Sequence, residues 1–138
     1  MIAHRYQELV CWQLAYELKL KVYAFTALDP AVRDFKYCSQ VRESARSAPS
    51  NMAEGFGRFA PAEFAQFLDY ARASLIETQN HLKDGRDLSY VSNNAYEEMY
   101  RLADRAIGAT TNLRKYLRAE AARRRKRPSA TDGQPFDR

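Results

Sequence analysis

Apolar residues recur every three or four positions along most of the chain, which places them on one face of an α-helix. The first run of this pattern covers residues 6–28, and its apolar face is formed by Cys11, Ala15, Leu18, Val22 and Phe25. Large side chains widen that face: Leu9, Trp12, Tyr16 and Tyr23. A helix with so wide an apolar arc either lies deep in its own bundle or presents the extra aromatic rings to another subunit. The sequence leaves both interpretations open.

The same pattern recurs at about residues 30–54 and 61–84, and in a fourth segment that begins near Ser92 or Asn93 and repeats through Leu117. Helices of about 22–28 residues are ~33–42 Å long, and short connections force neighbouring helices to run antiparallel. The sequence therefore predicts an all-α protein, in which residues 1–122 form an antiparallel up-down-up-down four-helix bundle. Residues 123–138 are expected to form a basic, disordered C-terminal tail.

Capping residues mark the expected helix ends. Asp29 suits the N-cap of the second helix. Gly85 suits the position just past the third helix, where glycine tolerates a left-handed backbone. Ser92 or Asn93 is expected to cap the fourth helix. Gly108 inside that helix costs about 1 kcal/mol relative to alanine, so we expect it to mark a tight contact.

Residues 47–58 read SAPSNMAEGFGR and combine a proline, small polar residues and two glycines. Pro49 lacks an N–H group and is expected to kink the second helix. Gly55 is interpreted as lying just past the helix end with a positive φ, and Gly57 as the point where the chain reverses. The letters from Gly55 to Ala60 also match G-x-G-x-x-G/A. That dinucleotide-binding fingerprint follows a strand, whereas a helical pattern precedes it here.

A stripe of polar residues lies beside the apolar face of the second helix and continues onto the third. Because buried polar groups need hydrogen-bond partners, we expect these residues to form a structural network that fixes the helix register at the kinked end of the bundle. Its expected members are Gln40, Ser47, Asn51, Glu54, Arg58, Ser74 and Glu77. The alternative is an ordinary solvated helix face.

The sequence contains no recognisable catalytic or metal-binding pattern. Di-iron bundles need Glu-x-x-His motifs, but His81 follows Glu77 by four residues and His4 lies near the terminus. Cys11 and Cys38 fall in helical stretches without a C-x-x-C motif, so we expect two buried free thiols. We therefore expect a protein that is not an enzyme, with no catalytic residue, no metal and no cofactor.

The sequence also lacks targeting signals. No apolar run approaches the ~20 residues of a membrane span, and the N-terminus does not follow the pattern of a signal peptide. We therefore expect a cytoplasmic protein without a membrane partner.

The basic charge is concentrated near the C-terminus. Residues 1–113 carry 13 basic and 14 acidic side chains, whereas residues 114–127 carry eight basic and one acidic. These eight are the candidate nucleic-acid-binding residues: Arg114, Lys115, Arg118, Arg123, Arg124, Arg125, Lys126 and Arg127. Only Tyr116 interleaves with them, so we expect recognition by charge or shape with weak base stacking. The alternative is a solvated basic helix end, which also suits the helix dipole.

Several motifs carry a family resemblance that covers about residues 5–117. They are LxxWQLA from Leu9 to Ala15, Gln40-x-Arg42, SAPSNMAEGFGR at 47–58, Glu63-Phe64 with Phe67-Leu68, and ARASLIE at 71–77. With these motifs the chain resembles the four-helix bundle proteins encoded in intervening sequences of bacterial 23S rRNA genes.

The resemblance implies a small, non-enzymatic cytoplasmic bundle that assembles as a homopentamer around a central axis. The function of the family is mostly unassigned. A related branch comprises accessory proteins of diversity-generating retroelements, which assist a reverse transcriptase and bind nucleic acid. The implied partners are thus other copies of this chain, RNA or DNA, and a protein such as a reverse transcriptase.

A protein-interaction scaffold with no nucleic-acid role is the alternative function. Tyrosine is enriched at protein interfaces, and we expect several tyrosines to be exposed: Tyr6, Tyr16, Tyr23, Tyr96, Tyr100 and Tyr116.

Overall fold

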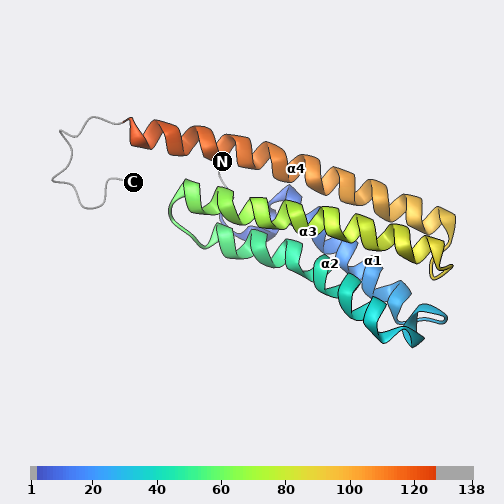
Figure 1. Cartoon of the computed structure of the whole chain (residues 1–138). Helices are drawn as coiled ribbons and strands as arrows, with labels where there is room; N and C mark the ends of the chain where they lie inside the picture. Colours follow the sequence, from blue (N-terminus) through green and yellow to red (C-terminus); the bar gives the residue numbers. More distant parts are fainter. Residues whose placement is uncertain (1–2, 127–138) are drawn as a thin grey trace.

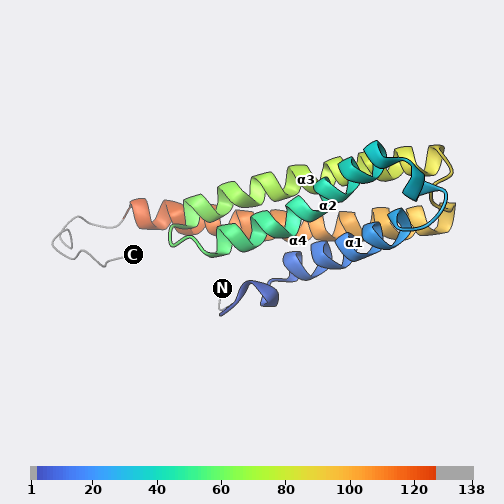
Figure 2. The ribbon, with the colours of Figure 1, turned by 90° about the horizontal axis from the view of Figure 1, so that it is seen from below.

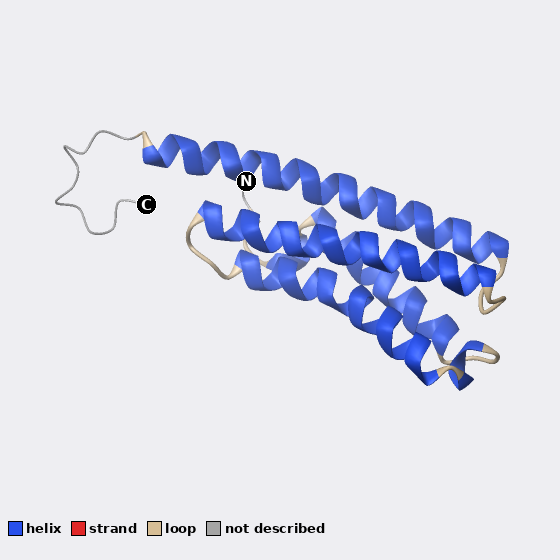
Figure 3. Cartoon of the chain, in the orientation of Figure 1, coloured by secondary structure: helices blue, strands red, loops and turns tan. Residues whose placement is uncertain are grey.

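The computed structural model describes residues 3–126, and all regular structure within them is helical (Figure 3). The long helices are α1 (Val10–Thr26), α2 (Phe35–Phe56), α3 (Pro61–Asp87) and α4 (Asn93–Arg125). Two short 3-10 turns, η1 (Tyr6–Glu8) and η2 (Ala31–Arg33), precede α1 and α2. Successive long helices run in opposite directions (Figure 1), and α1 and α3 each pack against both α2 and α4. The predicted up-down-up-down four-helix bundle is therefore confirmed.

Helix α4 is longer than its neighbours. Its 33 residues span about 50 Å, and both views show its last turns projecting beyond the loop between α2 and α3 (Figures 1 and 2). The helix ends at Arg125, with Lys126 as its C-cap. Residues 123–125, which we expected in the tail, are therefore helical, and residues 127–138 lie outside the described part of the chain.

The core consists of the predicted apolar faces. Leu18, Val41, Leu68 and Leu75 are fully buried, and a buried side chain of this size contributes about 1.5–3 kcal/mol. The small residues Ala45 and Ala48 of α2 are also buried. Ile76 of α3 is 44% exposed and lies outside this core.

Hydroxyl groups cross the core between α2 and α3. Thr78 Oγ1 donates to Ser44 Oγ at 2.9 Å and lies 2.8 Å from the carbonyl oxygen of Ser74. Both Ser44 and Thr78 are buried. Because a buried hydroxyl without a partner costs free energy, this pair favours one register of α2 against α3.

The second helix begins five residues later than expected. Asp34, not Asp29, is the N-cap of α2: its Oδ1 accepts from the backbone N–H of Tyr37 at 3.0 Å, and its Oδ2 accepts from the Tyr90 hydroxyl at 2.7 Å. Asp29 pairs instead with Arg33. Asp34 is thus the N-cap because its carboxylate accepts two hydrogen bonds, one of them from the backbone of α2. At the start of α4 the expected cap is confirmed, since Ser92 Oγ accepts from the backbone of Ala95.

The roles expected for Gly55 and Gly85 are wrong. Gly55 and Gly85 lie inside α2 and α3, and no glycine among the described residues has a positive φ. Ser89, at φ 62°, supplies the left-handed residue after α3. A Cβ on Gly55 would lie 2.8 Å from Phe64 and Phe67, and one on Gly85 would overlap the hydroxyl oxygen of Tyr37. Both glycines are therefore close-packing positions.

Replacing Gly55 by alanine should destabilise the bundle. The added methyl group forces Phe64 and Phe67 apart, and overpacking of this kind costs about 1–3 kcal/mol. Gly108→Ala is the matched control, because nothing lies within 4 Å of a Cβ there and the contact expected at Gly108 does not exist. That variant should gain about 1 kcal/mol in helix propensity. Urea unfolding of both variants checks this, and a Gly55→Ala protein as stable as the wild type would contradict it.

Asp34→Asn should change stability in a pH-dependent way. The hydrogen bonds from Tyr90 and from the Tyr37 backbone lower the pKa of Asp34 below its usual 3.8. The carboxylate therefore stabilises the fold above the unfolded-state pKa, and this contribution is lost as the pH falls through the folded-state value. The wild type should unfold at a higher temperature than Asp34→Asn at pH 6, and the difference should shrink towards pH 3. A difference constant across this range would contradict the assignment.

Candidate nucleic-acid interface

Two of the predicted basic residues, Arg114 and Arg118, are tied to one carboxylate. Arg114 Nε donates to Oδ1 of Asp69 on α3, and Arg118 Nη2 lies 3.1 Å from Oδ2 of the same residue. The three side chains are between 37% and 47% exposed. These two arginines hold α4 against α3, and this contact competes with binding of an external phosphate.

Glu120 engages the next pair of predicted residues. Arg123 donates to one of its carboxylate oxygens, and Arg124 Nε lies 3.6 Å from the other. The hydrogen bond from Arg123 lowers the pKa of Glu120. Glu120 is therefore ionised at neutral pH and offsets part of the basic charge.

Helical periodicity assigns the remaining basic residues to faces of α4. Each residue turns the helix by about 100°, so Lys115, Arg123 and Lys126 share one face, and all three are exposed. Arg124 lies about 180° from Lys115, on the opposite side of the helix, and Arg125 lies about 80° from Lys115, on the same side as Arg118. We call Lys115, Arg123 and Lys126 the basic face.

The end of α4 keeps an excess of positive charge. Residues 114–126 include seven basic side chains, and the carboxylates that pair with them are Asp69 and Glu120. The eighth predicted residue, Arg127, lies outside the described residues. The net charge of this end thus stays positive after its internal ion pairs are counted.

Three members of the expected polar network are hydrogen bonded to one another. Ser47 Oγ lies 2.8 Å from Ser74 Oγ, which joins α2 to α3. Asn51 Nδ2 donates to the carbonyl oxygen and to Oγ of Ser47, at 2.9 and 3.0 Å. Gln40, at the far end of the stripe, is exposed.

The other three members lie apart from these serines. Arg58 pairs with Glu54 at 3.4 Å and with Glu63 at 3.5 Å. Glu77 lies 3.4 Å from Nε2 of His81. No hydrogen bond within residues 3–126 links these groups to Ser47, because their long side chains extend to the solvent side of the helices.

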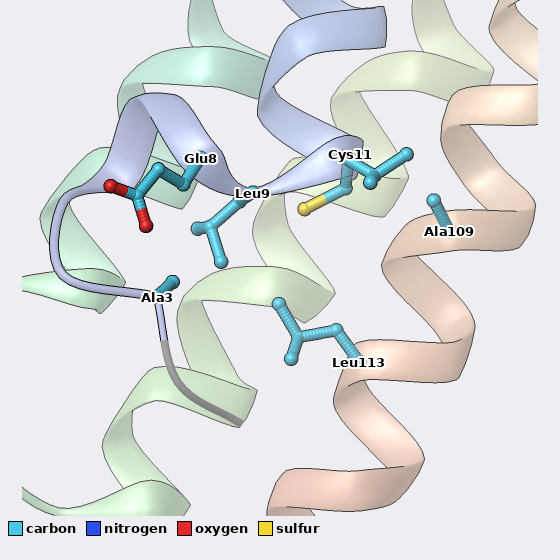
Figure 4. Close-up of a pocket in the computed structure, with 7 residues that line it drawn as sticks. Ala3, Glu8, Leu9, Cys11, Ala109 and Leu113 are labelled. Carbon is cyan, nitrogen blue, oxygen red and sulfur yellow. The ribbon is translucent and has the colours of Figure 1, made fainter.

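An apolar hollow lies where α1 begins against α4. It has a volume of about 390 Å³ and is bordered by Leu9, Cys11 and Leu113, with Glu8 at its edge (Figure 4). Glu8 Oε1 accepts from the backbone N–H of His4, and burial raises the pKa of the Cys11 thiol to about 11. A thiol of that pKa is a poor nucleophile at neutral pH, so this hollow offers no reactive pair.

Cys11 and Cys38 are buried free thiols, as predicted. Within residues 3–126, no group of three or more His, Cys, Asp or Glu side chains could hold a metal ion. None of the helices in this part of the chain combines the length and apolar character required to cross a membrane.

Comparison with known families gives a match over most of the bundle. The model of the 23S rRNA-intervening sequence protein family matches residues 7–112. The chain belongs to this family. A search of curated proteins found no match. The family match ends before Arg114, so the basic face of this 23S rRNA-intervening sequence protein lies outside the matched region.

Sequence reasoning missed the acidic partners of the arginines. Asp69 lies 45 residues before Arg114, and a distance of this kind follows only from the packing of α3 on α4. The partners of Glu120 could have been found, since Arg123 and Arg124 follow it at i+3 and i+4.

Asp69→Asn should weaken the contact between α3 and α4. It leaves Arg114 and Arg118 without their carboxylate, and partly exposed pairs of this kind contribute about 0.5–1 kcal/mol. The loss should shrink in 1 M salt, because salt screens the pairs. Urea unfolding at low and high salt measures both effects. Glu97→Gln, which removes an exposed carboxylate at the other end of α4, serves as the control, and an equal loss in the two variants would contradict the assignment.

Proposed function

We propose that this protein binds the phosphate backbone of RNA or DNA through the basic face of α4, without catalysing a reaction. The observation that carries the proposal is that Lys115, Arg123 and Lys126 share one exposed face on a helix that extends past the bundle. The face spans about 16 Å along the helix axis. Its charges release condensed counterions on binding, which makes the affinity strongly dependent on salt.

The internal ion pairs support a division of roles. Arg114 and Arg118 are paired with Asp69, so their role is to hold α4 against α3. Lys115 and Lys126 have exposed side chains, and Arg123 can exchange the Glu120 carboxylate for a phosphate oxygen. Backbone contacts of this kind position a nucleic acid but do not read its sequence.

A protein-interaction scaffold remains the second candidate, because apolar side chains are exposed on α1 and at the loop end of the bundle. Val10, Leu20, Leu28 and Phe35 are each at least 50% exposed. Tyr96, one of the tyrosines expected on the surface, is buried instead, with Arg86 4.4 Å above its ring. The exposed α1 residues are the surface we assign to self-association, including the homopentamer that the family resemblance implies.

We also propose a cytoplasmic location. Two cysteines kept as buried free thiols suit a reducing compartment, and the proposed partners, RNA or DNA and a protein such as a reverse transcriptase, occur there.

Reversing the three charges of the basic face should strongly weaken nucleic-acid binding. Lys115→Glu, Arg123→Glu and Lys126→Glu together remove about three phosphate contacts, so the slope of log affinity against log salt should fall by about two to three. Fluorescence anisotropy with labelled RNA and DNA from 50 to 300 mM salt measures this. The matched control reverses Lys36, Arg46 and Lys83, which are exposed elsewhere on the bundle. Equal binding by the two triple variants would overturn the proposal.

A further inference from the structure

A second hollow lies beside the basic face, between the α2–α3 loop and the end of α4. Its volume is about 280 Å³, near the lower limit of small-ligand pockets at about 300 Å³. A space of this size suits one planar ring system. Its lining comes from two regions far apart in sequence: residues 56–64, which include the α2–α3 loop and the adjoining helix ends, and the α4 residues 116–124.

The floor of this hollow is apolar. Phe64 is buried and meets the ring of Phe56 edge-on, with ring centroids 6.2 Å apart. Pro61 and Leu117, both buried, complete the floor. An aromatic ring placed here would cover apolar surface and lose contact with water.

Aromatic and charged groups form the rim. Phe59 from the loop is 81% exposed and Tyr116 from α4 is 41% exposed, and both line the hollow. Arg58, Arg124 and Glu120 also line the hollow. Arg58 is ion-paired with Glu54 and Glu63, and Glu120 with Arg123 and Arg124, so the edge of a base binds these groups by exchanging with those pairs. The combination of ring faces with both donors and acceptors matches the faces and edges of a nucleobase.

We propose that this hollow binds an unstacked base of a single-stranded nucleic acid whose backbone lies on the basic face. The inference rests on the proposed phosphate binding and adds the class of strand. Tyr116, Glu120 and Arg124 line the hollow. Arg123 follows Tyr116 by seven residues and lies about 20° from it around α4, so Arg123 is the member of the basic face that adjoins the hollow. A strand whose backbone binds Arg123 can therefore place a base next to Phe59.

A duplex cannot use this site, because its bases are already stacked and paired. Stacking of one base on an aromatic side chain contributes about 1–3 kcal/mol, which corresponds to roughly a 5- to 150-fold difference in affinity. Single strands should thus bind more tightly than duplexes of equal charge. Sequence reasoning had expected weak stacking, since only Tyr116 interleaves with the basic residues. The second ring, Phe59, comes from another part of the chain.

The test compares the full-length protein on three fluorescein-labelled probes: a mixed-sequence 12-nucleotide single strand, an abasic strand of the same length, and a duplex. The wild type should prefer the base-bearing strand over the abasic strand by roughly 5- to 150-fold. Phe59→Ala should remove that preference and leave duplex binding unchanged. Phe35→Ala is the matched control, because Phe35 is 83% exposed at the other end of the bundle, and it should retain the preference.

A conservative variant adds a direct readout. Phe59→Trp, made with Trp12→Phe to remove the single native tryptophan, keeps a ring for stacking. Its fluorescence should be quenched by the base-bearing strand and not by the abasic one. RNA and DNA versions of each probe show which backbone is preferred.

The possible failures are distinguishable. Equal binding of the base-bearing and abasic strands by the wild type, with loss of both on reversal of the basic face, would overturn the base site and leave phosphate binding intact. A preference that survives Phe59→Ala would also overturn the base site. Absence of salt-dependent binding to every probe would overturn both proposals.

Discussion

The close contact between α2 and α3 is the constraint on which the other features depend. It needs the missing side chain at Gly55, where Phe64 and Phe67 fill the space that a Cβ would occupy. It also needs the hydroxyl pairs Ser44–Thr78 and Ser47–Ser74, which favour one register along the core. Side-chain packing at Gly55 and the hydroxyl hydrogen bonds thus favour the same register of α2 against α3. With that arrangement fixed, the loop between the two helices has a defined position.

The position of this loop matters because α4 passes beside it. Asp69 on α3 pairs with both Arg114 and Arg118. These pairs fix the axial position of the end of α4 relative to the start of α3. Phe59 and Tyr116 then border the same hollow, although 57 positions separate them in the chain. Arg123 and Lys126, which follow Arg118 in the chain, are exposed.

Features set by residues close together in the chain could be predicted from the sequence. Periodic apolar residues gave four helices and their order, and the cap of α4 was narrowed to Ser92 or Asn93 because capping chemistry is local. The start of α2 was misplaced, because Asp34 gains its second hydrogen bond from Tyr90, 56 residues away. Gly55 and Gly85 were misread as helix ends for the same reason, since their neighbours Phe64 and Tyr37 belong to other helices. At the candidate site, the basic residues were visible in the sequence. Which of them pair with α3 and which form the basic face depends on Asp69, because Asp69 engages Arg114 and Arg118.

The uneven placement of charge has a consequence for how the molecule approaches a partner. Residues 1–113 carry 13 basic and 14 acidic side chains, whereas the tip of α4 is strongly positive. Such a rod has a large electric dipole along its length. The electric field of a polyanion orients this dipole before contact, so that the tip of α4 reaches the polyanion first. Productive encounters would then be a larger fraction of all collisions than random orientation allows, and this advantage would fade as salt shortens the reach of the field.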